Sequence, residues 1–302
     1  MRALVISDMA ATPDAPGRGV FVRDQVAALR RLPGLEVGLD EAPPGAPALA
    51  ALAARCIRRR GFDVVHAHYG LTAWPALAVR GAKRAVTLHG TDLRHPRTRR
   101  ITLAALPRLD LVATPTESLA AEVPGGRDVA ILPCGVSLDR FRPVPRREAR
   151  EALGLDPGAP LLLFPADPAR PGKRFDRARD VAGDTPLATL GAVAPDDVPL
   201  WINAASAVLV PSEAEGFGLA VLEALACDVP VLATPVGIHP EALAGVAGTL
   251  CAPFDADAWR TALAPHLAAA DPRVAGRPSA ERYSADRMAE RVAAAWSDLT
   301  AA

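Results

Sequence analysis

Two glutamates eight positions apart have the types and spacing best suited to chemistry in this chain. Glu215 stands just before the turn Gly216-Phe217-Gly218, and Glu223 lies in an apolar run that predicts a helix. Glycines let a backbone approach a ligand closely, and the start of a helix offers free N–H groups to a phosphate. The two carboxylates would instead accept hydrogen bonds from hydroxyl groups. The pattern therefore indicates a ligand with both phosphates and hydroxyls, such as a nucleotide-sugar.

A basic loop follows the first predicted strand of the second half of the chain. Arg170 and Lys173 lie in it, and no acidic residue follows Asp167 in the loop, so both charges are expected to be available. Fixed cations stabilise a departing diphosphate more strongly in the transition state than in the ground state. Neither a metal nor another cofactor is then expected. The alternative interpretation of such a pair is a solvated surface loop.

Three histidines follow or lie in predicted strands of the first half. His89 ends the predicted strand 85–89 and could be either structural or close to a ligand, and Asp92 could either orient that loop or cap the next helix. His66 and His68 lie on one face of a strand as i and i+2. Because no third metal ligand is evident, we expect them to be core or acceptor-cleft residues.

Short apolar strands alternate with helical segments along the whole chain, which predicts parallel, doubly wound α/β sheets with ligands beyond the carboxyl ends of the strands. The strands are expected at residues 2–7, 35–40, 62–66, 85–89, 109–113, 129–132, 161–164, 187–190, 207–210, 229–233 and 249–251. The helices are expected at residues 21–31, 46–59, 72–80, 174–181, 197–205, 219–227, 257–269 and 280–299.

These elements predict two domains joined by a proline-rich, charged linker. The expected bounds are an N-terminal domain at 1–140, a linker at 141–160, a C-terminal domain at 161–280, and a final helix at 281–302 that packs back towards the first domain. Two facing open α/β domains would hold a ligand in the cleft between them.

The chain has no formal net charge, but its charge is unevenly distributed. Residues 1–150 hold 23 Lys and Arg against 14 Asp and Glu, whereas residues 151–302 hold 11 against 20. The basic half could meet an anionic partner, although solvated arginine-rich helix faces explain the count equally simply. A nucleic-acid partner is not expected, because aromatic residues make up only 4% of the chain and no stacking motif accompanies the arginines.

The composition also indicates the cellular compartment. The four cysteines, at positions 56, 134, 227 and 251, show neither a pairing pattern nor a zinc-ligand pattern, so small buried thiols of a reduced protein are expected. No membrane-spanning run and no signal layout is seen. We therefore expect a cytoplasmic protein.

Several segments together carry a family resemblance. The stretch from Glu215 to Glu223 resembles the signature of the retaining glycosyltransferases of family 4, which have the GT-B fold. Residues 86–92, 135–143, 165–174 and 233–237 resemble, in the right order, that family's histidine loop, domain junction, diphosphate loop and strand-to-helix turn. The sequence of residues 19–25 and 167–171 is most similar to that of the teichuronic-acid-biosynthesis branch.

The resemblance implies specific roles for these residues. Glu223 would bind the ribose hydroxyls of a nucleoside-diphosphate sugar, and Glu215 would lie near the transferred sugar. Arg170 and Lys173 would hold the diphosphate, and His89 would lie beside the sugar. The backbone of the donor loops would contact phosphate or sugar at Gly216, Phe217, Gly218, Leu219, Gly17 and Gly19.

The implied reaction moves a sugar to an acceptor hydroxyl in the synthesis of a surface glycan, a glycolipid or a glycosylated metabolite. The acceptor would be anionic or lipid-linked, and the basic domain could contact a membrane peripherally. One departure from the family is a short segment, residues 174–190, which implies a trimmed second domain and leaves the base selectivity open. The alternatives are a sugar-nucleotide-binding accessory protein without turnover, a phosphorylase and a sugar-nucleotide epimerase.

Overall fold

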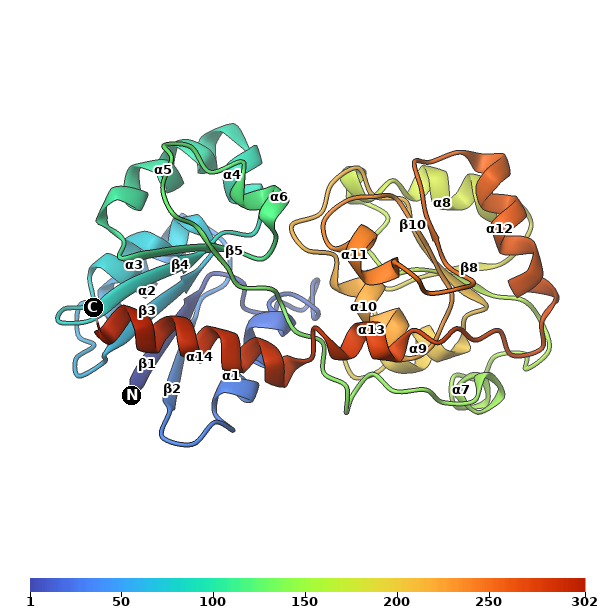
Figure 1. Ribbon diagram of the computed structural model, residues 1–302, viewed down its shortest axis with the longest axis horizontal. Coiled ribbons are helices and arrows are strands. Elements are labelled where there is room, and N and C mark those ends of the chain that lie inside the picture. The colour runs from blue at the N-terminus through green and yellow to red at the C-terminus, as the bar shows by residue number, and fades with distance from the viewer. Residues whose placement is uncertain (302) are drawn as a thin grey trace. The chain divides into compact units, whose positions relative to one another are not determined.

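The computed structural model describes residues 1–301, which form two compact units. The first unit comprises Met1–Pro13, Arg18–Gly135 and the C-terminal segment from Ala285, and the second comprises Asp14–Gly17 and Val136–Ser284. Each unit is an α/β fold built on one parallel sheet (Figure 1). The expected fold class is therefore confirmed for both units.

The first unit contains a six-stranded parallel sheet in the order β2-β1-β3-β4-β5-β6. Alternate side chains of its strands face opposite layers of helices, so that Leu4 and Ile6 pack into one core while Ala3 and Val5 pack into the other. The strands are β1 (Arg2–Ser7), β2 (Glu36–Glu41), β3 (Val64–His68), β4 (Lys83–Thr87), β5 (Leu111–Thr114) and β6 (Ala130–Ile131).

Helices cover both faces of this sheet. The C-terminal helix α14 (Ala285–Ala301) lies beside α1 (Val20–Leu29) on one face (Figure 1). Its Trp296 is fully buried there. The opposite face is covered by α2 (Ala46–Cys56), α3 (Ala73–Leu77), α5 (Pro96–Ala105) and α6 (Glu117–Ala120). The short elements η1 (Gly70–Thr72), α4 (Thr91–Arg94) and η2 (Leu106–Arg108) complete the unit.

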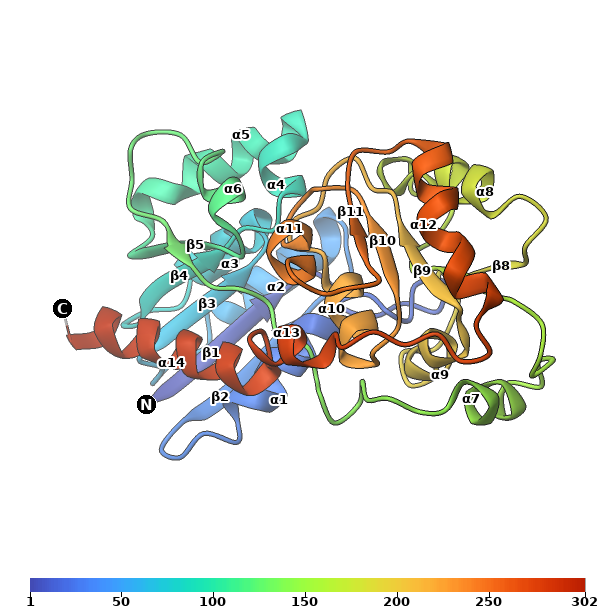
Figure 2. The same cartoon turned by 45° about the vertical axis from the view of Figure 1, so that its right-hand side comes forward.

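The second unit contains a five-stranded parallel sheet in the order β11-β10-β9-β7-β8, seen from a second angle in Figure 2. Its strands are β7 (Leu162–Phe164), β8 (Leu187–Thr189), β9 (Ala207–Val210), β10 (Val231–Ala233) and β11 (Leu250–Cys251). Its helices are α7 (Arg146–Ala152), η3 (Pro171–Lys173), α8 (Phe175–Ala182), α9 (Val198–Ala204), α10 (Leu219–Ala226), α11 (His239–Leu243), α12 (Ala256–Ala268) and α13 (Arg277–Glu281). Trp259 on α12 fills the core between α8 and the sheet.

The expected linker at residues 141–160 is instead an integral part of the second unit. It contains α7, whose Arg146 and Arg150 are both buried. Arg150 Nε donates to the carbonyl oxygen of Ala204 at 2.8 Å, and Arg146 Nη1 donates to Ser206 Oγ at 3.0 Å. A charged segment looks like a solvated linker in the sequence, but here backbone oxygens and a hydroxyl satisfy its guanidinium groups.

The helix expected at 280–299 is broken into α13 and α14. The backbone between them forms a bridge in which Val136 N donates to the Tyr283 carbonyl oxygen at 2.9 Å. Gly135 also lies so close to α14 that a Cβ atom there would be 2.7 Å from Ala285 Cα. A long-range strand-like contact therefore overrides a continuous helical pattern.

All four cysteines are free, and only Cys251 is partly exposed. Burial raises the pKa of Cys134 and of Cys227 to about 12, which keeps both thiols protonated and unreactive. The expectation of small, unpaired thiols is confirmed, with Cys251 as the least buried of them.

Candidate functional site

The predicted donor-site residues after position 160 lie in the loops that follow β7 and β9 and at the start of α10, and the turn after β10 packs against them. We call Lys173, Glu215, Gly218, Gly237 and His239 the glutamate site. Its two main loops are joined by their backbones, because Glu213 N donates to the Gly172 carbonyl oxygen at 2.9 Å. Residues more than forty positions apart in the sequence are thereby held together.

An ion pair lies at the centre of the glutamate site. Lys173 Nζ is 2.7 Å from both carboxylate oxygens of Glu215, and the two side chains are only 20% and 9% exposed. Burial alone would raise the pKa of Glu215, but the charge and hydrogen bonds of Lys173 outweigh it, so this pKa is lowered. The expectation that both loop cations are available is therefore wrong for Lys173, because a carboxylate distant in the sequence pairs with it.

The positive charge of Arg170 is available, as predicted from the sequence. Its side chain is exposed, and within residues 1–301 no hydrogen bond or ion pair involves its guanidinium group. Its backbone N–H closes the loop by donating to the Asp167 carbonyl oxygen at 3.1 Å. Because Lys173 and Glu215 neutralise one another, Arg170 supplies the unpaired positive charge of this loop.

Glycine is required at two positions around Glu215. Gly218 begins α10 with a φ of 109°, and a Cβ there would lie 2.5 Å from His239 Nε2. Gly237 has a φ of 58°, and a Cβ there would lie 2.3 Å from the Phe217 carbonyl oxygen. The glycine turn before the helix and the turn after β10 thus pack directly against each other, as only glycine allows.

His239 was not predicted as a site residue, although it follows the turn at residues 233–237. This side chain is fully buried, and its Nδ1 lies 2.8 Å from the Thr234 carbonyl oxygen. Nδ1 therefore carries the proton, and Nε2 has no partner among the described residues. Burial lowers the pKa of His239 despite the nearby charge of Glu215, so the ring is neutral.

Glu223 lies on α10, as predicted, and is partly buried. It is four residues after Leu219, so both side chains lie on the same face of the helix. Gly216 and Phe217 precede the helix, and Phe217 is buried against the ring of Tyr283 at a centroid distance of 6.1 Å. The structure therefore groups the predicted donor-loop residues of the second unit around the start of α10.

The remaining glycines have different surroundings. Gly19 begins α1 with a φ of 67°, and a Cβ there would lie 2.1 Å from the Met9 carbonyl oxygen. Around Gly17 a Cβ would meet nothing within 4 Å. Gly19 is thus a structural requirement of its turn, whereas Gly17 is not.

In the first unit, three histidines form a column that we call the histidine stack, in which His66 and His68 are buried and His89 is partly buried. His66 and His68 come from β3, and His89 follows β4, which ends two residues earlier than expected, at Thr87. The rings of His66 and His68 are 5.1 Å apart at 10°, and those of His68 and His89 are 5.3 Å apart at 19°. The expectation of core residues is confirmed for His66 and His68, which are 0% and 1% exposed.

Hydrogen bonds tie the histidine stack together. Trp296 Nε1 donates to His66 Nδ1 at 2.9 Å, His66 Nε2 lies 2.8 Å from Thr87 Oγ1, and His68 Nδ1 lies 3.0 Å from His89 Nε2. Burial lowers the pKa of His66 to about 3 and that of His89 to about 4. The stack is therefore uncharged at neutral pH.

Asp92 orients the loop that holds His89, which resolves the two possibilities left open by the sequence. Its carboxylate accepts hydrogen bonds from the backbone N–H groups of Gly70, His89 and Gly90 at 2.8–3.1 Å. Gly90, and not Asp92, stands at the N-cap of α4. Burial raises the pKa of Asp92, which the three backbone hydrogen bonds oppose.

Residues 1–301 contain no group of three or more His, Cys, Asp or Glu side chains that could hold a metal ion. The one Asp-x-Asp triplet with both carboxylates near a helix start, Asp255 to Asp257, is used structurally. Asp255 accepts from Ala258 N at 2.8 Å as the N-cap of α12, and Asp257 pairs with Arg260 at 3.0 Å.

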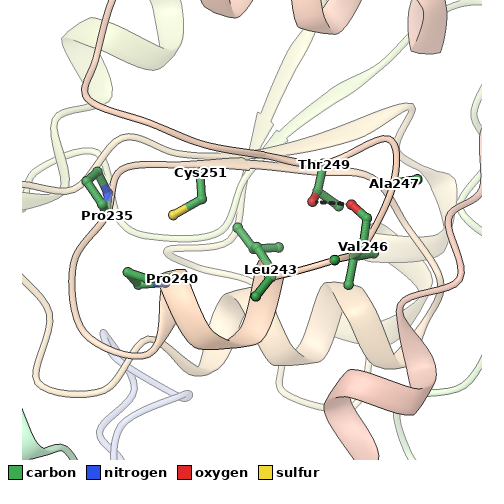
Figure 3. Close-up of a pocket in the computed structure, with 9 residues that line it drawn as sticks. Pro235, Pro240, Leu243, Val246, Ala247, Thr249 and Cys251 are labelled. Atoms are coloured by element: carbon green, nitrogen blue, oxygen red, sulfur yellow. Dashed lines mark hydrogen bonds between the residues drawn. The ribbon is translucent and has the colours of Figure 1, made fainter.

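A separate hollow of about 650 Å³ lies beside β11 and α11 of the second unit (Figure 3). Its labelled wall is mostly apolar, and the hydrogen bond drawn in it joins Thr249 Oγ1 to the Val246 carbonyl oxygen at 2.7 Å. None of the predicted site residues lines it. It offers neither a cation for a diphosphate nor a carboxylate for a hydroxyl, so it is not a candidate for the donor site.

The chain is similar to known glycosyltransferases along most of its length. A family model described as Glycosyltransferase Family 4 matches residues 5–140, and one described as Glycosyl transferases group 1 matches residues 160–268. A D-inositol 3-phosphate glycosyltransferase of Mycolicibacterium paratuberculosis is 31% identical over 91% of this chain and 74% of its own length. That of Mycobacterium avium is 37% identical over 47% of this chain and 41% of its own length.

Solved structures show the same fold. Sucrose-phosphate synthase from Thermosynechococcus elongatus matches with a TM-score of 0.75 at 21% identity over all of both chains. Anabaena HepE in complex with UDP-glucose matches with a TM-score of 0.72 at 17% identity, over 98% of this chain and 99% of that one. These comparisons support the family resemblance, but not the closer likeness to the teichuronic-acid branch.

Proposed function

The chain belongs to glycosyltransferase family 4, and we propose that it moves a sugar from a nucleoside-diphosphate sugar to an acceptor hydroxyl with retention at the anomeric carbon. The solved complexes of HepE with UDP and UDP-glucose support a nucleotide-sugar donor. The residue roles, the absence of a cofactor and the acceptor are parts of the proposal.

The ion pair of Lys173 and Glu215 at the start of α10 is the observation that carries this proposal. Lys173 has three N–H donors, and the hydrogen bonds to Glu215 leave one for an oxygen of a diphosphate. The carboxylate of Glu215 keeps lone pairs for a sugar hydroxyl. One pair of side chains therefore offers a donor to phosphate and an acceptor to sugar at the same place.

The proposed reaction balances without a metal. The bond between the anomeric carbon and the diphosphate oxygen breaks, and its electron pair leaves with the diphosphate. The acceptor oxygen forms its bond on the same face, and its proton passes to an oxygen of the departing diphosphate. Arg170, Lys173 and the free amides at the start of α10 would stabilise the growing negative charge.

Glu223 would hold the ribose hydroxyls, and the backbone of residues 216–219 would contact phosphate or sugar. We propose that Gly17 and Gly19 border the donor and that His89 lies beside the transferred sugar. Glu223→Ala is then expected to raise the donor KM with little change in kcat, since it removes binding common to the ground and transition states.

Turnover tests the proposal directly. Purified protein is mixed with nucleotide-sugars and candidate acceptors, and release of nucleoside diphosphate and of glycosylated product is followed by chromatography. Release that requires Lys173 and Arg170 supports glycosyl transfer. Tight donor binding without any release would instead identify a sugar-nucleotide-binding accessory protein, and conversion of the donor without acceptor would identify an epimerase.

The nucleotide base of the donor is still to be identified, because the segment between Lys173 and Gly191 is short and contains only α8 and β8. A thermal-shift screen against UDP-, GDP-, ADP- and dTDP-sugars would identify it. At a hundredfold excess over its Kd, a bound donor should add about 2.7 kcal/mol to the free energy of unfolding. A chain that none of the four stabilises would refute a nucleotide-sugar donor of these kinds.

For the acceptor, we propose an anionic polyol, and D-inositol 3-phosphate is the first compound to test. The names of the relatives and the excess of basic residues in the first half support this choice. Transfer to D-inositol 3-phosphate, but not to unphosphorylated inositol, is the expected result. Equal transfer to both would remove the phosphate requirement.

We also propose peripheral contact of the first unit with anionic membranes, because an apolar and basic surface lies at α5. Trp74 is 39% exposed, Ile101 is 46% exposed, and the guanidinium of Arg108 lies 5.8 Å from the centre of the Trp74 ring. Interfacial tryptophan beside arginine suits a lipid headgroup region. Within residues 1–301, none of the helices is long and apolar enough to cross a bilayer.

Liposome sedimentation tests the membrane contact. Binding to vesicles with anionic lipid at low salt, lost at high salt and weakened by Trp74→Ser with Ile101→Ser, is expected. The matched control, Ile57→Ser, changes another exposed apolar residue outside this surface. No binding at low salt would exclude the contact.

A further inference from the structure

His68 has a chemical environment that neither its burial nor its strand position explains. It is 1% exposed, it stacks between His66 and His89, and its Nδ1 lies 3.0 Å from His89 Nε2. Its other nitrogen, Nε2, is buried without a partner in the described chain. An apolar side chain would fill such a place at lower cost, so the ring must offer something else.

The first step fixes the protonation of His66. Indole Nε1 of Trp296 is only a donor, so His66 Nδ1 accepts from it with a lone pair. His66 is neutral, and its proton is therefore on Nε2, which donates to Thr87 Oγ1 at 2.8 Å. One end of the stack is thus set by the C-terminal helix.

The second step concerns the bond between His68 and His89. Both rings are neutral, because burial lowers the pKa of each, so one ring donates and the other accepts. If His89 donated, the proton of His68 would be on Nε2 and would be buried with no acceptor. If His68 donates from Nδ1, only a lone pair is left unpaired at Nε2. A buried donor without an acceptor is the rarer and costlier defect.

The third step follows for His89. Its Nε2 accepts from His68, so its own proton is on Nδ1. That atom has no hydrogen-bond partner within residues 1–301, and it is not among the atoms closed off from solvent. The ring of Phe21 packs edge-on against the His89 ring at a centroid distance of 4.9 Å. The backbone N–H of His89 donates to the carboxylate of Asp92 at 3.0 Å, which fixes the main chain at this position.

We propose that His68 is a positioning residue that donates to His89 Nε2 and so makes His89 present an Nδ1–H donor to a substrate oxygen. The inference rests on the proposed function for the identity of that oxygen, which would belong to the transferred sugar. The inferred tautomer of His89 does not depend on the proposed function. His68 itself touches no substrate, and it acts through His89.

Nuclear magnetic resonance of the full-length protein tests the tautomer, since long-range proton–nitrogen correlations distinguish Nδ1–H from Nε2–H. The wild type should show His89 with its proton on Nδ1. His68→Asn, whose amide N–H can replace the Nδ1 donor, should keep that tautomer, whereas the nearly isosteric His68→Leu should lose it. If His68→Leu does not fold, His68→Phe retains the stack without a donor.

Trp296→Phe is the matched control. It removes a hydrogen bond from the same stack without touching the His68–His89 pair, so the tautomer of His89 should not change. An Nε2–H tautomer in the wild type, or the same tautomer in His68→Leu as in the wild type, would overturn the proposal.

Kinetics distinguishes positioning from general loss of structure. His68→Leu is expected to lower kcat about tenfold, as for the loss of one transition-state hydrogen bond, with donor KM nearly unchanged and with rescue by His68→Asn. Equal losses in His68→Leu and His68→Asn would refute positioning through this bond. If the wild type shows no transfer at all, the proposed function fails, while the tautomer measurement still decides the role of His68.

Discussion

The histidine stack and the glutamate site hold buried ionisable groups in opposite ways. In the first unit, three imidazoles are uncharged because burial lowers their pKa values, and the hydrogen bonds that hold them join neutral groups. In the second unit, Lys173 and Glu215 keep their charges and satisfy each other at 2.7 Å. A neutral cluster can be loosened one bond at a time, whereas an ion pair that loses one partner leaves a buried charge. The two regions should therefore respond differently to mutation and to pH.

Breaking the ion pair should have the largest effect. Lys173→Met leaves the carboxylate of Glu215 without its counter-charge at 9% exposure. The free energy of unfolding should fall by about 3 kcal/mol, the lower end for a buried pair because Lys173 is partly exposed, and turnover should fall by about a hundredfold. Chemical denaturation and initial rates measure both.

The double variant Lys173→Met with Glu215→Gln is the control for this prediction. It removes both charges, so it should recover most of the stability but none of the activity. A double variant as unstable as Lys173→Met would show that packing, and not the unpaired charge, causes the loss.

The pH dependence of stability should separate the two regions next. The pKa of His66 is lowered from 6.5 to about 3, so the unfolded chain binds the extra proton between these values. The stability it contributes is complete above pH 6.5 and is lost as the pH falls towards 3. At pH 5 this loss is about 2 kcal/mol. The contribution of Glu215, whose pKa is lowered from 4.5, is lost only at lower pH.

His66→Gln isolates this effect, because glutamine does not titrate. The fall in unfolding free energy between pH 7 and pH 5 should be about 2 kcal/mol smaller in this variant than in the wild type. Denaturant titrations at the two pH values measure it. Identical falls in both proteins would mean that His66 is not buried as a neutral ring.

Removing an unpaired charge from the glutamate site should affect catalysis alone. Arg170 is exposed and makes no side-chain bond among the described residues, so Arg170→Ala should leave stability unchanged. It should reduce kcat about tenfold, since it removes charge stabilisation from the leaving diphosphate. Arg142→Ala, a change at another exposed arginine of the same unit whose side chain makes no bond among the described residues, should alter neither quantity. Unchanged kcat in Arg170→Ala would exclude Arg170 from the reaction.

The fold and the glycine turns could be predicted from the sequence because both depend on local patterns. The loops that meet at Glu215 are identified by the apolar strands before them, by the glycines before α10 and by the segments that resemble family 4. The pairing of Lys173 with Glu215 could not be predicted, since it depends on how loops 42 positions apart approach each other. The histidine stack was hidden for the same reason, because its third ring and its tryptophan come from other elements.

The predicted boundaries of segments were wrong where contacts between distant residues determine them. The charged residues of α7 look like a linker until Ala204 and Ser206 are brought beside them. The break between α13 and α14 depends on a bridge to Val136, nearly 150 positions earlier in the chain. Local patterns therefore predict the elements, while long-range hydrogen bonds fix where they end.

A final effect is expected at Asp8, a buried carboxyl group of the first unit that lies outside the histidine stack. It follows β1 and is 8% exposed, and burial raises its pKa from 3.8 to about 6, with Arg18 opposing and Asp92 adding to the rise. Because the folded chain holds the proton more tightly, stability falls as the pH rises from about 4 to 6 and stays reduced above that. Asp8→Asn should therefore gain up to about 3 kcal/mol at pH 7 and less than about 1 kcal/mol at pH 4. Thermal unfolding at both pH values measures the difference. A variant that is less stable than the wild type at pH 7 would mean that the backbone hydrogen bond and the charge of Arg18 outweigh the cost of burying the charged carboxylate of Asp8.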